Sequence, residues 1–227
     1  YWLKRQEKGR LYNFINILEN CKGKYIALLD GDDYWTDPLK LQKQVEFLED
    51  HDDYVMVYQK WVEKDGDEIR VPRNNIASTH TRLFRNIDLS EEMNKVGKVL
   101  NGDTVSQFLL SHYGKFKCID DLKPAVKRKD SGGVWNSLDI DERAKAGFNT
   151  AKALYNAFKK TKYDKAAKLR YIKTYRKPNV KMTLGIKEFE VAKILYNEGL
   201  FATYSSVVKN DIKKDIVLFI RKYIFQK

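Results

Sequence analysis

A short apolar run followed at once by three carboxylates constrains the fold more than any other feature of this sequence. The run Tyr25–Leu29 is continuous, as expected for a strand that is buried on both faces of a sheet. The acidic turn Asp30–Asp33 follows it, and Thr36-Asp37-Pro38 then predicts the start of a helix. A second apolar run, Tyr54–Tyr58, predicts the next strand. Strand, turn, helix and strand make a βαβ unit, so the sequence predicts an α/β fold.

The other elements are predicted from the spacing of apolar residues and from the positions of glycine and proline. They are a helix over 11–18, a polar hairpin and loop over 63–80, a helix between Gly102 and Gly114, and strands at 115–119 and 125–126. Beyond residue 140 we expect almost only helices, with breaks near Lys162, Pro178 and Gly199.

Charge divides the chain into two regions. Residues 1–140 carry 22 Lys and Arg against 23 Asp and Glu, whereas residues 141–227 carry 21 against 8. We therefore expect one domain at 1–140 and a basic, helical region at 141–227. Cys21 and Cys118 are the two cysteines and show no metal-ligand spacing. Because secreted disulfide frameworks use more cysteine, this favours a reduced, cytoplasmic location. The sequence has no apolar stretch near the roughly 20 residues of a membrane-spanning helix.

Three carboxylates within four residues repel one another unless a cation lies among them. The Asp-x-Asp spacing allows Asp30 and Asp32 to reach one ion from a tight turn, and hard oxygen ligands suit Mg²⁺ or Mn²⁺. Open α/β sheets also bind ligands at the carboxyl ends of their buried strands. The alternative is a solvated turn in which Asp33 caps the following segment.

The stretch GKYIALLDGDDYWTDPLKLQKQVEFLEDHDDYVMVY resembles the middle of a family 2 glycosyltransferase of the GT-A fold. Upstream, EKGRLYNFINILEN extends the resemblance, and downstream THTRLFRN, NGDTVSQFLLSHYGK and VKRKDSGGVW do so, over residues 5–137 in all. The resemblance implies a partial GT-A sheet for nucleotide-sugar binding, without the first strands of the family. Either the chain is a fragment, or another chain supplies those strands, or activity is lost.

What the family does implies a function for this chain. It would be a metal-dependent, inverting glycosyltransferase that moves a sugar from a UDP- or GDP-sugar to a polysaccharide or lipid-linked acceptor. Asp30 would contact the donor ribose or the metal, Asp32 would bind the metal directly, and Asp33 would order the turn. Asp103 lies where the family keeps its catalytic base, although its local sequence also suits it to cap its own helix.

Two further positions near the end of the resemblance are candidate ligands. Asp130 stands where the family has a histidine that completes the metal shell, and its carboxylate could still bind Mn²⁺ or Mg²⁺. Arg128 is the candidate clamp for the diphosphate. Its alternative is to be one of three successive cations on a solvated edge.

The segment 205–227 combines apolar residues along one side of a predicted helix with lysines and arginines over much of the rest. Such a helix could lie on an anionic membrane surface, at the inner face of the plasma membrane, or pack its apolar side on the domain. Nucleic-acid binding is disfavoured because no binding motif accompanies the basic residues. The alternative to an enzyme is an inactive glycosyltransferase fragment that binds a membrane surface or a partner.

Overall fold

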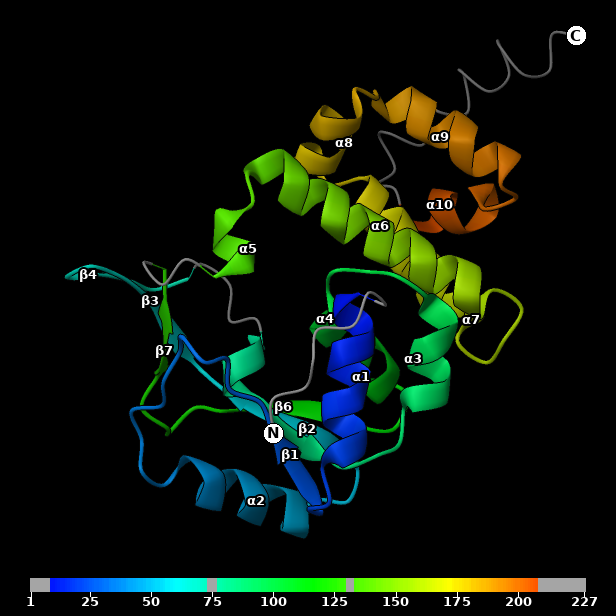
Figure 1. The fold of residues 1–227 in the computed structure, drawn as a ribbon. Helices are drawn as coiled ribbons and strands as arrows, with labels where there is room; N and C mark the ends of the chain where they lie inside the picture. The colour runs from blue at the N-terminus through cyan, green and yellow to red at the C-terminus, as the bar shows by residue number, and fades with distance from the viewer. Residues whose placement is uncertain (1–8, 73–76, 130–132, 208–227) are drawn as a thin grey trace, which may run out of the picture. The chain divides into compact units, whose positions relative to one another are not determined.

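The computed structural model describes residues 9–72, 77–129 and 133–207, and the chain divides into two compact units (Figure 1). Unit 1 extends to Ser137, and unit 2 begins at Leu138. Unit 1 contains two β-sheets with helices around them, whereas the described part of unit 2 is helical. The fold class is therefore α/β with a helical C-terminal region, as the sequence predicts.

The central sheet of unit 1 has the strand order β1-β5-β2-β6. Its strands are β1 (Tyr25–Ala27), β5 (Leu83–Arg85), β2 (Tyr54–Gln59) and β6 (Lys115–Ile119). β2 and β6 are parallel, whereas β5 is antiparallel to both of its neighbours. The predicted strands β1 and β2 thus run in the same direction, but they do not pair with each other because β5 lies between them.

The described part of unit 1 also contains helices (Figure 1). They are α1 (Arg10–Asn20), α2 (Lys40–Asp50), α3 (Ser90–Val96), α4 (Gly102–Leu110) and the short α5 (Val134–Ser137). Helices α1, α3 and α4 contact one another, and α2 packs against β2. Leu48 of α2 is fully buried in a cluster with Val57 and Leu83 of the central sheet, whereas Leu41 near the start of the helix is exposed.

A second sheet has the strand order β4-β3-β7. Its strand β7 is bridged to Tyr34, the residue that follows the acidic turn. Strands β3 (Trp61–Asp65) and β4 (Glu68–Arg70) form the predicted hairpin, and Gly66 at its tip has a φ of 59° that favours glycine. Strand β7 (Ala125–Arg128) pairs in parallel with β3. A 3₁₀ turn, η1 (Thr79–Thr81), then precedes β5.

Five helices make up the described part of unit 2. They are α6 (Ile140–Phe158), α7 (Asp164–Tyr175), α8 (Pro178–Leu184), α9 (Glu188–Asn197) and α10 (Phe201–Val207). The breaks predicted near Lys162, Pro178 and Gly199 all fall at helix boundaries. A further break follows α8 at Gly185, whose φ of 63° is the left-handed conformation that ends many helices.

Unit 2 has an aromatic core. The rings of Tyr155 and Tyr171 are stacked with centroids 5.2 Å apart, and Phe148 packs edge-on against Tyr175 at 4.8 Å. Over the residues that the structure describes, no helix combines the length and the apolar character needed to cross a membrane. Most of the predicted membrane-surface segment, residues 208–227, lies outside the described residues.

Candidate functional site

The acidic turn lies at the carboxyl end of β1 and is joined to the second sheet. Its backbone is closed by a hydrogen bond of 3.1 Å from Asp33 N to Asp30 O. The next residue, Tyr34, exchanges two backbone hydrogen bonds with Val126 of β7, at 3.1 and 2.9 Å. The turn is thereby held between the end of β1 and the side of β7.

Asp33 fastens the turn through both of its carboxylate oxygens. Its side chain is only 4% exposed, and Oδ1 accepts a hydrogen bond of 3.0 Å from the backbone N–H of Arg128. Oδ2 lies 3.1 Å from Nδ1 of His80, whose side chain is 1% exposed. Asp33 therefore links the acidic turn to β7 and to η1.

Negative charge accumulates at Asp30. One ligand atom each of Asp30, Asp33 and His80 lie within 4.8 Å of one another. Although Asp30 as a whole is exposed, desolvation first and then repulsion from Asp33 and Asp32 raise the pKa of its carboxyl. A divalent cation at the turn would relieve this repulsion, so oxygen ligands and electrostatics both fit a hard metal ion.

Asp103 lies in the first turn of α4, while Asn101 occupies the N-cap position. Thr79 Oγ1 donates a hydrogen bond of 3.1 Å to Asp103 Oδ2, and a guanidinium nitrogen of Arg82 lies 3.7 Å from the same oxygen. Arg82 also donates to the Asp103 backbone carbonyl at 3.0 Å. The Asp103 charge contributes to the raised pKa of Asp30, so the two carboxylates belong to one electrostatic environment.

The structure brings together several of the residues predicted from the sequence. The electrostatic environment of the acidic turn includes Asp30, Asp32 and Asp103. Arg128, at the end of β7, donates its backbone N–H to Asp33 and is an exposed residue. Asp32 is partly buried in the turn but is not one of the three residues whose ligand atoms converge. Asp130 lies outside the described residues.

His80 is a site residue that the sequence reasoning missed. It is 47 positions from Asp33 in the chain, and no local pattern connects the two. Its Nε2 is buried and has no hydrogen-bond partner among the described residues, while its ring packs edge-on against Trp61 at 5.7 Å. With Nδ1 facing Asp33, the imidazole supports the acidic turn from below the surface.

Lys40, at the start of α2, was also missed. It is 1% exposed, and its Nζ lies 2.7 Å from Gln44 Oε1 and 4.1 Å from the centroid of the Trp35 ring. Lys40, Gln44 and Leu48 are the buried residues of α2, and their spacing of four places them on one helix face. That spacing was a signal in the sequence that Lys40 faces the interior.

Burial lowers the pKa of Lys40 to about 7 from an ordinary value of 10.5. Between these two pH values the unfolded chain binds a proton that the folded protein does not, so rising pH stabilises the folded protein. In Lys40→Met this contribution is absent. We therefore expect the free energy of unfolding of Lys40→Met, minus that of the wild type, to fall by up to about 4 kcal/mol from pH 7 to pH 10.5. Urea denaturation at both pH values measures it, and parallel pH curves for the two proteins would contradict it.

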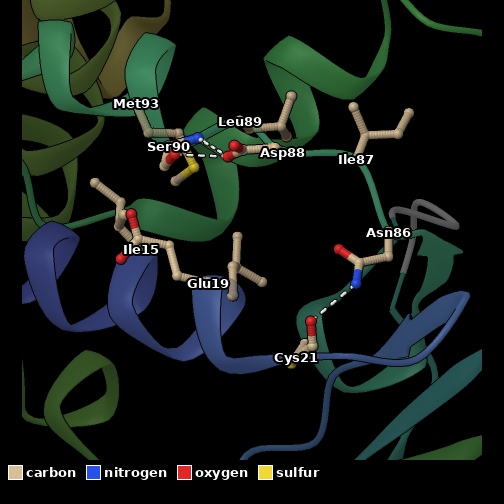
Figure 2. Close-up of a pocket in the computed structure, with 10 residues that line it drawn as sticks. Ile15, Glu19, Cys21, Asn86, Ile87, Asp88, Leu89, Ser90 and Met93 are labelled. Atoms are coloured by element: carbon tan, nitrogen blue, oxygen red, sulfur yellow. Dashed lines mark hydrogen bonds between the residues drawn. The ribbon is translucent and has the colours of Figure 1, made fainter.

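A cavity of about 270 Å³ lies at the other end of β1, away from the acidic turn. It is lined by α1, by the segment after β5 and by α3. Asn86 donates a hydrogen bond of 3.0 Å to the carbonyl of Cys21, which joins the two sides of the cavity, and Ser90 bonds to Asp88 (Figure 2). Because Asn86 follows Arg85, the partner of Tyr25, this cavity borders the start of β1 and is separate from the site.

Comparison with known proteins identifies the family and the fold of this chain. Residues 2–117 match the family described as glycosyl transferase family 2, and the chain belongs to this family. Its fold is the GT-A fold. A crystal structure of residues 1–349 of S. aureus TarS superposes with a TM-score of 0.55 at 14% identity, covering 97% of this chain and 69% of that one. The TarS complex with UDP-GlcNAc gives a TM-score of 0.53 at 15% identity, covering 91% and 64%.

The sequence is also similar to mycobacterial proteins. Uncharacterized protein Rv1520 of Mycobacterium tuberculosis and uncharacterized protein Mb1547 of Mycobacterium bovis are each 51% identical to it over 49 residues. The match spans 22% of this chain, and this chain covers 14% of the length of each of those relatives.

Proposed function

We propose that this chain is the catalytic part of a metal-dependent, inverting glycosyltransferase that uses a nucleotide-sugar donor. The observation that carries the proposal is the acidic turn at the end of β1, joined through η1 to a second carboxylate, Asp103, on α4. Family membership supports the reaction class. The structural neighbour TarS has been crystallised with UDP and with UDP-GlcNAc, which supports a uridine diphosphate sugar as the donor class.

Asp30 and Asp32 are proposed to hold the cation, Mn²⁺ or Mg²⁺. Both oxygens of Asp33 already face donors, so Asp33 is better suited to orient the turn than to bind the ion. The cation would neutralise the diphosphate as it leaves the sugar. Asp130 is proposed as a further ligand, and Arg128 as a cationic contact to the diphosphate at the end of β7.

Asp103 is proposed as the base that takes the proton from the attacking acceptor hydroxyl. Thr79 and Arg82 both contact Oδ2, which holds this oxygen in place. In the described part of the chain this leaves Oδ1 to accept the proton. The side chain is 31% exposed, so an acceptor hydroxyl can approach it from solvent.

The acceptor is proposed to be a polysaccharide or a lipid-linked glycan, and the site of action the cytoplasmic face of the plasma membrane. The excess of 21 Lys and Arg over 8 Asp and Glu in residues 141–227 supports this proposal. A basic surface is attracted to anionic headgroups by roughly 1 kcal/mol per cation near the membrane.

Metal dependence can be measured on the protein as its gene encodes it. We expect release of UDP or GDP from a panel of nucleotide sugars in the presence of Mn²⁺, loss of that release with EDTA, and recovery with excess Mn²⁺. Glu49→Gln is a matched control because Glu49 is an exposed acid paired with Lys24 far from the turn. Turnover that EDTA does not affect would contradict the role of the metal, and no turnover with any donor would contradict the activity itself.

A further inference from the structure

Trp35, Lys40 and Gln44 form a buried cluster between α2 and η1, called here the Lys40 clamp. The side-chain nitrogen of Lys40 lies against the ring face of Trp35, 4.1 Å from its centroid, and donates to Gln44 Oε1 at 2.7 Å. The cluster has no carboxylate within ion-pair distance of Lys40 among the described residues. Lys40 is therefore held by a ring and an amide, both neutral.

The other two members of the clamp each hold a backbone carbonyl of η1. Trp35 Nε1 donates a hydrogen bond of 2.7 Å to the carbonyl of His80, and Gln44 Nε2 donates one of 3.1 Å to the carbonyl of Thr81. Two consecutive carbonyls thus accept hydrogen bonds, one from Trp35 in the segment before α2 and one from Gln44 of α2. This fixes both the position and the rotation of the three-residue turn.

Lys40 and the carbonyl of Thr81 together orient the Gln44 amide. The Lys40 amine donates to Gln44 Oε1 at 2.7 Å, and the Thr81 carbonyl can only accept, so it takes the Gln44 NH₂ group. An apolar residue at position 40 would remove one of these two contacts from the amide and would leave one face of Trp35 without its amine partner.

The turn that the clamp holds carries two side chains of the proposed site. His80 Nδ1 faces Asp33 at 3.1 Å, and Thr79 Oγ1 donates to Asp103 at 3.1 Å. A displacement of η1 would therefore disturb the acidic turn and the proposed base together. These contacts place η1 between the two functional parts of the site.

We propose that Lys40 is a positioning residue, which acts through Trp35 and Gln44 to hold η1 so that His80 and Thr79 orient the acidic turn and Asp103. The inference rests on the proposed function for its effect on metal binding, but its structural part does not. Lys40 itself touches neither donor nor metal. An apolar side chain at this position would avoid the cost of burying an amine. The positioning role explains why a lysine lies in the interior here.

The experiment compares Lys40→Met with wild type in the full chain. The protein has four tryptophans and therefore four indole N–H groups. The signal of the Trp35 indole N–H is identified as the one that is missing in Trp35→Phe. We expect its hydrogen exchange to become at least about tenfold faster in Lys40→Met, since its bond to the His80 carbonyl is less well held. We also expect the Kd for Mn²⁺ to rise about tenfold, as for other residues that support metal ligands. The melting temperature should stay the same or rise.

Lys43→Met is the matched control. Lys43 lies on the same helix but pairs with Asp121 near the surface, and neither the indole exchange nor the Mn²⁺ affinity should change in that variant. Unchanged indole exchange in Lys40→Met would overturn the inference. Should Lys40→Met not fold, Trp35→Phe decides, because it keeps an aromatic ring beside Lys40 and removes the N–H together with the five-membered ring that carries it. Unchanged Mn²⁺ affinity in Trp35→Phe would overturn the inference. A wild-type protein that binds no Mn²⁺ contradicts the proposed function, while the exchange comparison still tests the clamp.

Discussion

Asp103→Asn is expected to lower the kcat of sugar transfer by about 10²- to 10⁴-fold, the usual contribution of a general base. The amide has the same shape and can still accept the hydrogen bond from Thr79, but it cannot take a proton from an acceptor hydroxyl. The KM for the nucleotide sugar and the melting temperature should therefore change little. Steady-state kinetics with the donor varied at saturating acceptor measures both constants.

Glu91→Gln is the control for this variant. Glu91 also lies in the first turn of a helix, α3, but it is exposed and paired with Lys95. Its replacement should leave kcat and KM unchanged. A loss of only a few-fold in kcat for Asp103→Asn, or a loss confined to the donor KM, would show that another group removes the proton.

The strands and helices near the acidic turn were predictable because local sequence determines them. Ile26 and Leu28 in the run at Tyr25 are buried, as is Leu48 of α2, and burial of apolar residues leaves a record in the sequence. Strand β5 was missed for the opposite reason. It is three residues long, and a short strand is determined by the neighbours that pair with it on both sides, which lie far away in the chain.

The candidate site was predictable only in part, for a similar reason. The three acids after β1 are adjacent in sequence, so their mutual repulsion can be inferred without a structure. The contacts of Asp33 with His80 and of Asp103 with Thr79 join residues 47 and 24 positions apart. Such contacts depend on how η1 is placed between α2 and α4. Periodicity within one element carries no information about that placement.

The acids at positions 32 and 33 provide the second large effect. Asp32→Asn is expected to abolish Mn²⁺ binding, because it removes a proposed ligand, whereas Asp33→Asn is expected to weaken it only about tenfold, as for a residue that supports ligands. Titration calorimetry with Mn²⁺, in the presence and absence of UDP, measures both. The two variants differ by one position and by the same chemical change, so each is the control for the other.

Stability should show the reverse order for the same pair. Asp33 is 4% exposed and bonds to Arg128 N and His80, so its replacement is expected to lower the free energy of unfolding by about 1–3 kcal/mol. Asp32 is more accessible, and its replacement relieves repulsion with Asp30, so the unfolding free energy should hold or increase. Abolished Mn²⁺ binding in Asp33→Asn with normal binding in Asp32→Asn would instead place the ion among Asp30, Asp33 and His80, whose ligand atoms converge within 4.8 Å. In that case His80→Asn would also abolish binding, and the buried imidazole would be a ligand and not a support.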